Sequence, residues 1–167
     1  MRNNRVIFRM KYRAVVILLL CLPILSCNDD DDQDMEYPVI IMNSGDASPL
    51  NCAVIYRGES FPFKAIFTDN QELGSYNIEI HNNFDHHSHS TENEECELDS
   101  KKEPVNPFIY NKDYVIPTGE TYFAADNIVE VPADVDTGDY HFMIRLTDKA
   151  GWQALKAVSI KIRDKNE

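Results

Sequence analysis

Alternation of apolar and polar positions marks three long strands in the chain. Residues 60–68 alternate with their aromatic and alanine side chains on one face, and residues 74–81 and 139–147 repeat the pattern. Each segment therefore predicts a strand with one face in a core and the other turned outward. The same period of two puts His81 and His141 on outward faces.

Shorter apolar runs predict the remaining strands. They are residues 37–42, 53–56, 127–131 and 155–162, and residues 105–116 predict an irregular strand pair because proline, asparagine and aspartate interrupt them. Turn-forming residues separate the runs, and there is almost no helix signal. The pattern predicts an all-β fold, an immunoglobulin-like two-sheet antiparallel sandwich over residues 37–164.

Residues 131–152 resemble the last strands of bacterial immunoglobulin-like domains. A strand that ends at Pro132 leads to a G-x-Y turn, a further strand and a D-x-x-G turn. Tyr140 matches the tyrosine corner of that fold, whose hydroxyl binds back to the backbone. The intersheet cysteine pair and the core tryptophan of antibody domains are absent, so the chain is not of the antibody type.

The N-terminus reads as a lipoprotein signal peptide over residues 1–26. Five basic residues precede an apolar run that is too short to span a membrane, and Ile24 to Ser26 resemble a lipobox before Cys27, the expected lipidation site. Residues 27–36 form an expected acidic tether, whose run Asp29 to Asp32 looks like the surface-export signal of Bacteroidetes-type lipoproteins. We therefore expect an outer-membrane protein, lipid-anchored and exposed on the cell surface.

The charge excludes one class of partner. Without the leader the chain keeps 11 of its 16 basic residues and all 28 acidic ones, a net charge of minus 17. Such a surface repels nucleic acid and attracts cations, so nucleic-acid binding is set aside. Solubility alone is the simpler explanation of the charge.

Two cysteines remain once the leader and the lipidated residue are accounted for. Cys52 and Cys96 are expected to form a disulfide in an oxidising compartment. The closed loop of 44 positions would contribute about 4 kcal/mol in the disputed chain-entropy model. The other reading is a free Cys96, or one that binds a metal beside the histidines.

The stretch HNNFDHHSH, residues 81–89, holds four of the five histidines. Neutral imidazole is a favoured ligand of zinc, copper and nickel, and ligands on one short segment are gathered at low entropy cost. The stretch therefore predicts a transition-metal site. The plainer alternative is a solvated loop, within the polar segment 82–104, that binds metals only adventitiously.

The predicted fold brings a fifth histidine to this stretch. Strands 74–81 and 139–147 would be antiparallel neighbours in one sheet, so His81 and His141 should lie close together. The expected ligands are therefore His81, His87, His89 and His141, with zinc or copper as the first choice of metal. His86 comes next, and Asp85 is either a ligand or an acceptor that holds an imidazole tautomer. For His141 alone, a plain surface histidine is the alternative.

Two stretches of the sequence are typical of one family. They are HNNFDHHSH following TDNQELGSYNIEIH, and CNDDDD at the expected mature end. With them the chain resembles a family of Bacteroidetes lipoproteins called domain of unknown function 4625. The resemblance covers roughly residues 37–163. It implies an immunoglobulin-like fold and brings no activity with it.

These features favour a non-enzymatic lipoprotein that captures or buffers a metal ion at the cell envelope, or delivers it to an outer-membrane transporter. The alternative is an adhesion or accessory module that binds glycan or protein, in which the loop metal is structural or absent. An enzyme is not expected, because the sequence has no nucleophile elbow, no HExxH helix and no recognisable acid and base pair.

Overall fold

The computed structural model describes residues 33–43, 45–92 and 94–166 of the chain. The predicted signal peptide, the lipidation site Cys27 and the run Asp29 to Asp32 lie outside the described residues. In the part that is described, regular structure consists of strands. None of the described segments is a helix long and apolar enough to cross a membrane.

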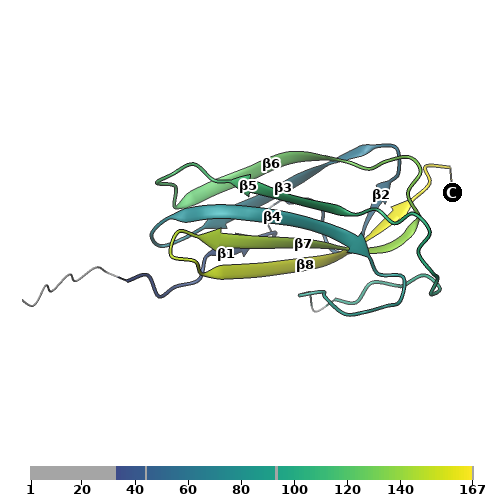
Figure 1. Cartoon of the computed structure of the whole chain (residues 1–167), viewed down its shortest axis with the longest axis horizontal. Coiled ribbons are helices and arrows are strands. Elements are labelled where there is room, and N and C mark those ends of the chain that lie inside the picture. Colours follow the sequence, from purple (N-terminus) through teal and green to yellow (C-terminus); the bar gives the residue numbers. More distant parts are fainter. Residues whose placement is uncertain (1–32, 44, 93, 167) are drawn as a thin grey trace, which may run out of the picture. The chain divides into compact units, whose positions relative to one another are not determined.

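Eight strands in the described residues form two sheets that face each other (Figure 1). One sheet has the order β1-β3-β6 and the other the order β2-β8-β7-β4-β5. The strands are β1 Val39–Ile41, β2 Ala53–Tyr56, β3 Ser60–Thr68, β4 Leu73–Asn82, β5 Tyr110–Val115, β6 Tyr122–Glu130, β7 Gly138–Asp148 and β8 Gln153–Arg163. This arrangement confirms the predicted all-β sandwich.

The core lies between the sheets and consists of the inward faces that the alternation predicted. Phe63 and Phe67 of β3 and Phe142 of β7 are fully buried, and the rings of Phe63 and Phe142 lie 5.6 Å apart across the two sheets. Each such side chain contributes roughly 1.5–3 kcal/mol when it leaves water. The period-two pattern therefore sets which side of each strand faces the partner sheet.

The predicted tyrosine corner is present. The Tyr140 hydroxyl donates to the carbonyl of Asp136 at 2.7 Å and accepts from the backbone N–H of Phe108 at 3.2 Å. Burial raises the pKa of Tyr140 to about 12, so the hydroxyl stays protonated as a donor. The bond to Asp136 holds the connection before β7 in place.

The structure departs from the predicted strands in three places. β2 pairs with β8 in parallel, so the sandwich is not wholly antiparallel, because the chain crosses from one sheet to the other between β1 and β2. β6 starts at Tyr122 rather than at residue 127, since its first half continues the pairing with β3. Residues 105–116 contain one strand, β5, and not a pair, because the backbone of Val105 and Asn106 binds the Asp136 carboxylate instead.

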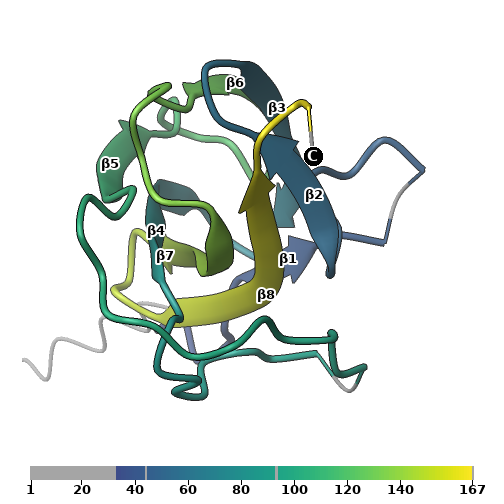
Figure 2. The same ribbon diagram turned by 90° about the vertical axis from the view of Figure 1, so that its right-hand side faces the viewer.

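The long loop, residues 83–109 between β4 and β5, lies along the outer side of β8 (Figure 2). The predicted disulfide between Cys52 and Cys96 is present, with the two Cα atoms 5.5 Å apart. Further contacts attach the loop. The backbone N–H and hydroxyl of Thr91 bind Ala157 of β8, and Asp99 pairs with Lys161 and Arg163. The loop is therefore held against the sheet along its length.

Contacts with the sandwich are already present at Asp34, within the stretch expected to be a tether. Asp34 is only 6% exposed, and its carbonyl accepts a hydrogen bond from the indole N–H of Trp152 at 2.9 Å. Its carboxylate binds the side chain of Asn70 at 3.1 Å. Residues from Asp34 onward thus pack on the sandwich.

Candidate metal site

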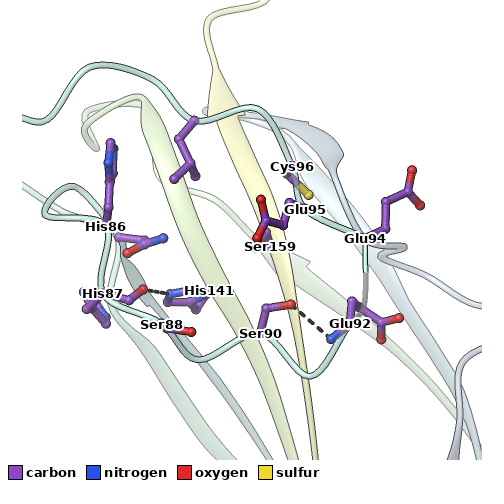
Figure 3. Close-up of a pocket in the computed structure, with 12 residues that line it drawn as sticks. His86, His87, Ser88, Ser90, Glu92, Glu94, Glu95, Cys96, His141 and Ser159 are labelled. Carbon is purple, nitrogen blue, oxygen red and sulfur yellow. Dashed lines mark hydrogen bonds between the residues drawn. The ribbon is translucent and has the colours of Figure 1, made fainter.

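Four histidine side chains meet on the outer face of the five-stranded sheet. His81 near the end of β4 pairs directly with His141 near the start of β7, which confirms that the two are neighbours. His87 and His89 reach them from the long loop, and Figure 3 shows His87 beside His141. We call these four residues the histidine cluster. Its six ring-centre distances all lie between 4.9 and 5.5 Å.

A tight turn directly after β4 carries the loop histidines back over the sheet. The backbone N–H of Asn83 binds the carbonyl of Asp139 at 2.8 Å, and that of His86 binds the carbonyl of Asn83 at 3.2 Å. His86 has a left-handed backbone, with φ of 64°, which reverses the chain. Phe84 is buried against the Tyr140 ring, 5.3 Å away, and anchors the turn in the core. The next residue after the turn, His87, therefore lies above β7.

The ring centres form a nearly regular tetrahedron. A metal about 2.0–2.1 Å from an imidazole nitrogen lies about 3.2 Å from the ring centre, which puts four tetrahedral rings about 5.2 Å apart. The observed separations of 4.9–5.5 Å bracket that value. Copper(II) and nickel(II) prefer a square arrangement of ligands. In a square, two of the six distances are diagonals about 1.4 times as long as the other four. The six similar distances correspond to a tetrahedron.

Carboxylates fix the tautomers of two members. The Nδ1–H of His81 donates to Glu79 at 3.1 Å, and the Nδ1–H of His87 donates to Asp85. An ionised carboxylate can only accept, so in both neutral rings Nε2 is left with a free lone pair. A carboxylate behind a histidine also raises the basicity of the ligand nitrogen. Ligand nitrogens of His81, His87 and His89 lie within 4.8 Å of one another.

His141 lies beside these three, with its ring centre 5.1 to 5.5 Å from theirs, but neither of its nitrogens belongs to the set that lies within 4.8 Å of one another. Its Nε2 lies 3.0 Å from the backbone carbonyl of His87, and a carbonyl can only accept, so Nε2 carries the proton. The neutral ring then has its lone pair on Nδ1, a buried atom with no hydrogen-bond partner among the described residues. A buried acceptor without a partner costs free energy. The dashed line in Figure 3 marks the bond to the His87 carbonyl.

The surroundings of His81 and His141 favour the form of imidazole that binds metals. Burial lowers the pKa of His81 and of His141, and the neighbouring histidines lower both further. The hydrogen bond from His87 lowers the pKa of Asp85, so that carboxylate remains an acceptor. Imidazole must be neutral to bind a metal, so these two residues are suited to metal binding at neutral pH.

The cluster is open on one side and covered on the other. His141 lies on the outer face of its strand, as predicted. It is nevertheless only 2% exposed, because the loop that crosses above it removes it from solvent. His89 is exposed and His87 is partly exposed, which gives an ion access from solvent. Beside the cluster, the two arms of the loop form a pocket whose lining includes Glu92, Glu94 and Glu95. These carboxylates place negative charge near the entrance.

Comparison with known families identifies the fold family. The family model described as Domain of unknown function (DUF4625) matches residues 25–163. The chain belongs to this family. No curated protein matches this DUF4625 member. Among solved structures, it is similar to a "GspB Siglec domain", with 21% identity and a TM-score of 0.43, covering 79% of this chain and 60% of that one. The chain thus spans less than two thirds of the length of that structure.

The remaining residues of the DUF4625 domain that we predicted as site members lie in other positions. His86 is outside the cluster, because its Nε2 donates to the carbonyl of Asp99 at 2.9 Å and its ring points away from His141 (Figure 3). Asp85 holds the His87 tautomer. Cys96 is in the disulfide, so its sulfur is not a free thiolate. The sequence analysis missed Glu79, although its position two residues before His81 puts both on one strand face.

Proposed function

We propose that this protein binds one transition metal ion through His81, His87, His89 and His141, and that it captures or buffers that ion at the cell envelope. Zinc is the preferred ion. The proposal rests chiefly on His81, His87 and His89, whose ligand nitrogens lie within 4.8 Å of one another. His141 is added as the fourth ligand because its buried Nδ1 has no hydrogen-bond partner among the described residues while its other nitrogen is bonded to the backbone. A metal ligated by that Nδ1 would supply the missing partner.

The shape of the cluster supports the choice of zinc. Zinc has no geometric preference from d electrons and takes tetrahedral nitrogen ligands, whereas copper(II) and nickel(II) favour square arrangements. Copper(I) also accepts a tetrahedral set, but it prefers sulfur ligands. Four imidazoles carry no charge, so the bound ion would keep its two positive charges facing the acidic loop.

A four-histidine set also supports binding rather than catalysis. Catalytic zinc keeps one coordination position for water, whereas a site with four protein ligands is closed. In the proposed role the protein is anchored through Cys27 at the outer membrane, and the ion passes to a partner such as an outer-membrane transporter. Release would begin at the exposed His89 and end at the buried His141.

Metal content and calorimetry test the proposal directly. Protein purified from its native source should carry close to one equivalent of zinc, and the stripped protein should take up one equivalent with a rise in its unfolding temperature. Less than about a tenth of an equivalent, with no thermal response to zinc, copper or nickel, would reject it.

Variants separate a built site from adventitious binding. We expect His81→Ala and His141→Ala to weaken zinc binding by at least about tenfold, since each removes a ligand from the sheet. His86→Asn is the matched control, because it removes a histidine of the same loop that lies outside the cluster, and asparagine tolerates the left-handed backbone at this position. Equal losses in all three variants would favour tag-like binding. Glycan or protein binding that survives His87→Ala and His89→Ala would favour the adhesion alternative.

A further inference from the structure

A second group of possible ligands lies at the other end of the sandwich. Asp34 precedes β1, Asp69 directly follows β3, and Asp148 ends β7. One carboxylate oxygen of each lies within 4.8 Å of one of each of the others. We call these three residues the carboxylate cluster. In Figure 1 this end, where β7 turns into β8, is opposite the long loop.

The two clusters are far apart. Leu73 pairs with Asp148 at one end of β4 and β7, and His81 pairs with His141 near the other. Eight residues of β4 separate Leu73 from His81, a distance of about 26 Å at the usual rise of a strand. The carboxylate cluster is therefore independent of the histidine cluster.

One oxygen of each turn carboxylate has an ordinary structural role. Asp69 Oδ1 accepts from the backbone N–H groups of Gln71 and Glu72 at 2.9 and 2.8 Å. Asp148 Oδ1 accepts from those of Gly151 and Trp152 at 2.6 and 2.8 Å. These bonds shape the two turns, as aspartate commonly does. These bonds would be met by either an aspartate or an asparagine at each position. They use Oδ1 and do not require the second carboxylate oxygen, Oδ2.

The second oxygens carry the inference. Oδ2 of Asp69 and Oδ2 of Asp148 are both buried and have no hydrogen-bond partner among the described residues. Asp148 is 4% exposed and Asp34 is 6% exposed. Buried carboxylate oxygens are normally paired, because an ionised group without a partner is costly to remove from water.

Within the described part of the chain, no lysine or arginine forms an ion pair with any of the three carboxylates. The neighbouring Lys149 lies 3.9 Å from Glu72 instead. Three close carboxylates without a cation repel one another. A positive ion among them would relieve the repulsion and satisfy both unpartnered oxygens at once.

From this geometry we propose that Asp34, Asp69 and Asp148 bind a calcium ion. Calcium takes oxygen ligands at about 2.3–2.6 Å, so two oxygens on one ion lie at most about 5.2 Å apart, and a set within 4.8 Å fits. All three ligands are hard carboxylates, in contrast with the nitrogen ligands of the histidine cluster. The ion would join the segment before β1 to the turns after β3 and β7.

Trp152 offers a direct readout. It is the single tryptophan of the chain. Its indole donates to the Asp34 carbonyl, and its backbone N–H donates to Asp148. Calcium added to the chelator-treated protein should change Trp152 fluorescence with one equivalent bound, and excitation of Trp152 should sensitise luminescence of bound terbium(III). Saturating calcium should raise the unfolding temperature by about 5 °C or more.

Two conservative variants test the assignment. Asp148→Asn and Asp69→Asn keep an oxygen for the turn bonds and remove one charge, so each should weaken calcium binding by at least about tenfold. Without calcium, each variant should be at least as stable as the wild type, because repulsion is reduced. Glu72→Gln is the control, since Glu72 pairs with Lys149 outside the cluster.

Several results would overturn the proposal. They are no response of the wild type to calcium or terbium, a response to magnesium alone, or Asp148→Asn binding calcium as the wild type does. If Asp148→Asn fails to fold by circular dichroism, Asp69→Asn decides by the same criteria. His87→Ala should keep the full calcium response, so failure here is separate from failure of the zinc proposal.

Discussion

Single residues behind the ligands set how strongly the histidine cluster should bind. Glu79 and Asp85 each accept a hydrogen bond from the Nδ1–H of one ring, and the backbone carbonyl of His87 accepts one from the Nε2–H of His141. Three rings are thus fixed in a tautomer before any ion arrives. Less ordering entropy is then lost on binding.

Replacing a carboxylate that holds a tautomer should weaken the site without removing a ligand. We expect Asp85→Ala to lower zinc affinity by about 10- to 100-fold, since His87 would lose its orienting acceptor. Calorimetric titration of the metal-free protein measures the change. Glu92→Ala is the comparison, because Glu92 lies on the same loop but pairs with Lys156. Unchanged affinity in Asp85→Ala would show that the hydrogen bond to His87 does not contribute.

The Tyr140 hydroxyl should matter for stability and little for the ion. Tyr140→Phe leaves the Asp136 carbonyl and the Phe108 N–H without this partner, and should lower the free energy of unfolding by about 1–3 kcal/mol. Urea denaturation measures the loss. A change below about 0.5 kcal/mol would mean that water replaces the hydroxyl.

At the scale of elements, the long loop is attached on both sides of its histidines. The bonds of Asn83 and Thr91 to β7 and β8 flank the segment that carries His87 and His89, and Cys96 lies beyond them. The disulfide therefore stabilises the outer part of the loop more than the part that bears ligands.

Removal of the disulfide should separate stability from binding. We expect a variant with both Cys52→Ala and Cys96→Ala to lose about 2–5 kcal/mol of unfolding free energy. Its zinc affinity should fall by less than about tenfold, because the nearer attachments remain. Denaturation and titration of the same preparation measure both. A loss of zinc binding as large as that in His141→Ala would mean that the disulfide positions the ligands.

The strands that could be predicted from the sequence are those whose alternation of apolar and polar residues matches the faces that they bury in the structure. The alternation in β3, β4 and β7 predicted their faces and, through the sandwich topology, the meeting of His81 with His141. Side-chain contacts within the loop could not be predicted, because they depend on the left-handed turn at His86. That turn directs His86 away and His87 inward, although the two are adjacent and identical in type.

At the scale of the whole molecule, the lowered pKa values of His81 and His141 make stability depend on pH. In the unfolded chain these residues have a pKa near 6.5. The unfolded state therefore takes up protons that the folded state resists, and the metal-free protein should lose stability as the pH falls below about 6.5. The loss should end below the folded-state pKa values.

Thermal unfolding of the metal-free protein across this pH range tests the prediction. His81→Gln should show a shallower loss than the wild type. The lowered pKa values of Asp99 and Asp136 act only below their usual value of 3.8, so they do not interfere. A stability that is flat between pH 7 and 5 would contradict the assigned shifts.

The placement of the two clusters at opposite ends of β4 and β7 has a consequence for how they load with ions. His81 and Leu73, which mark those ends on β4, are about 26 Å apart, or about three Debye lengths at physiological ionic strength. The charge of an ion bound at one end is therefore screened at the other. Filling the carboxylate cluster should leave the zinc affinity of the histidine cluster unchanged.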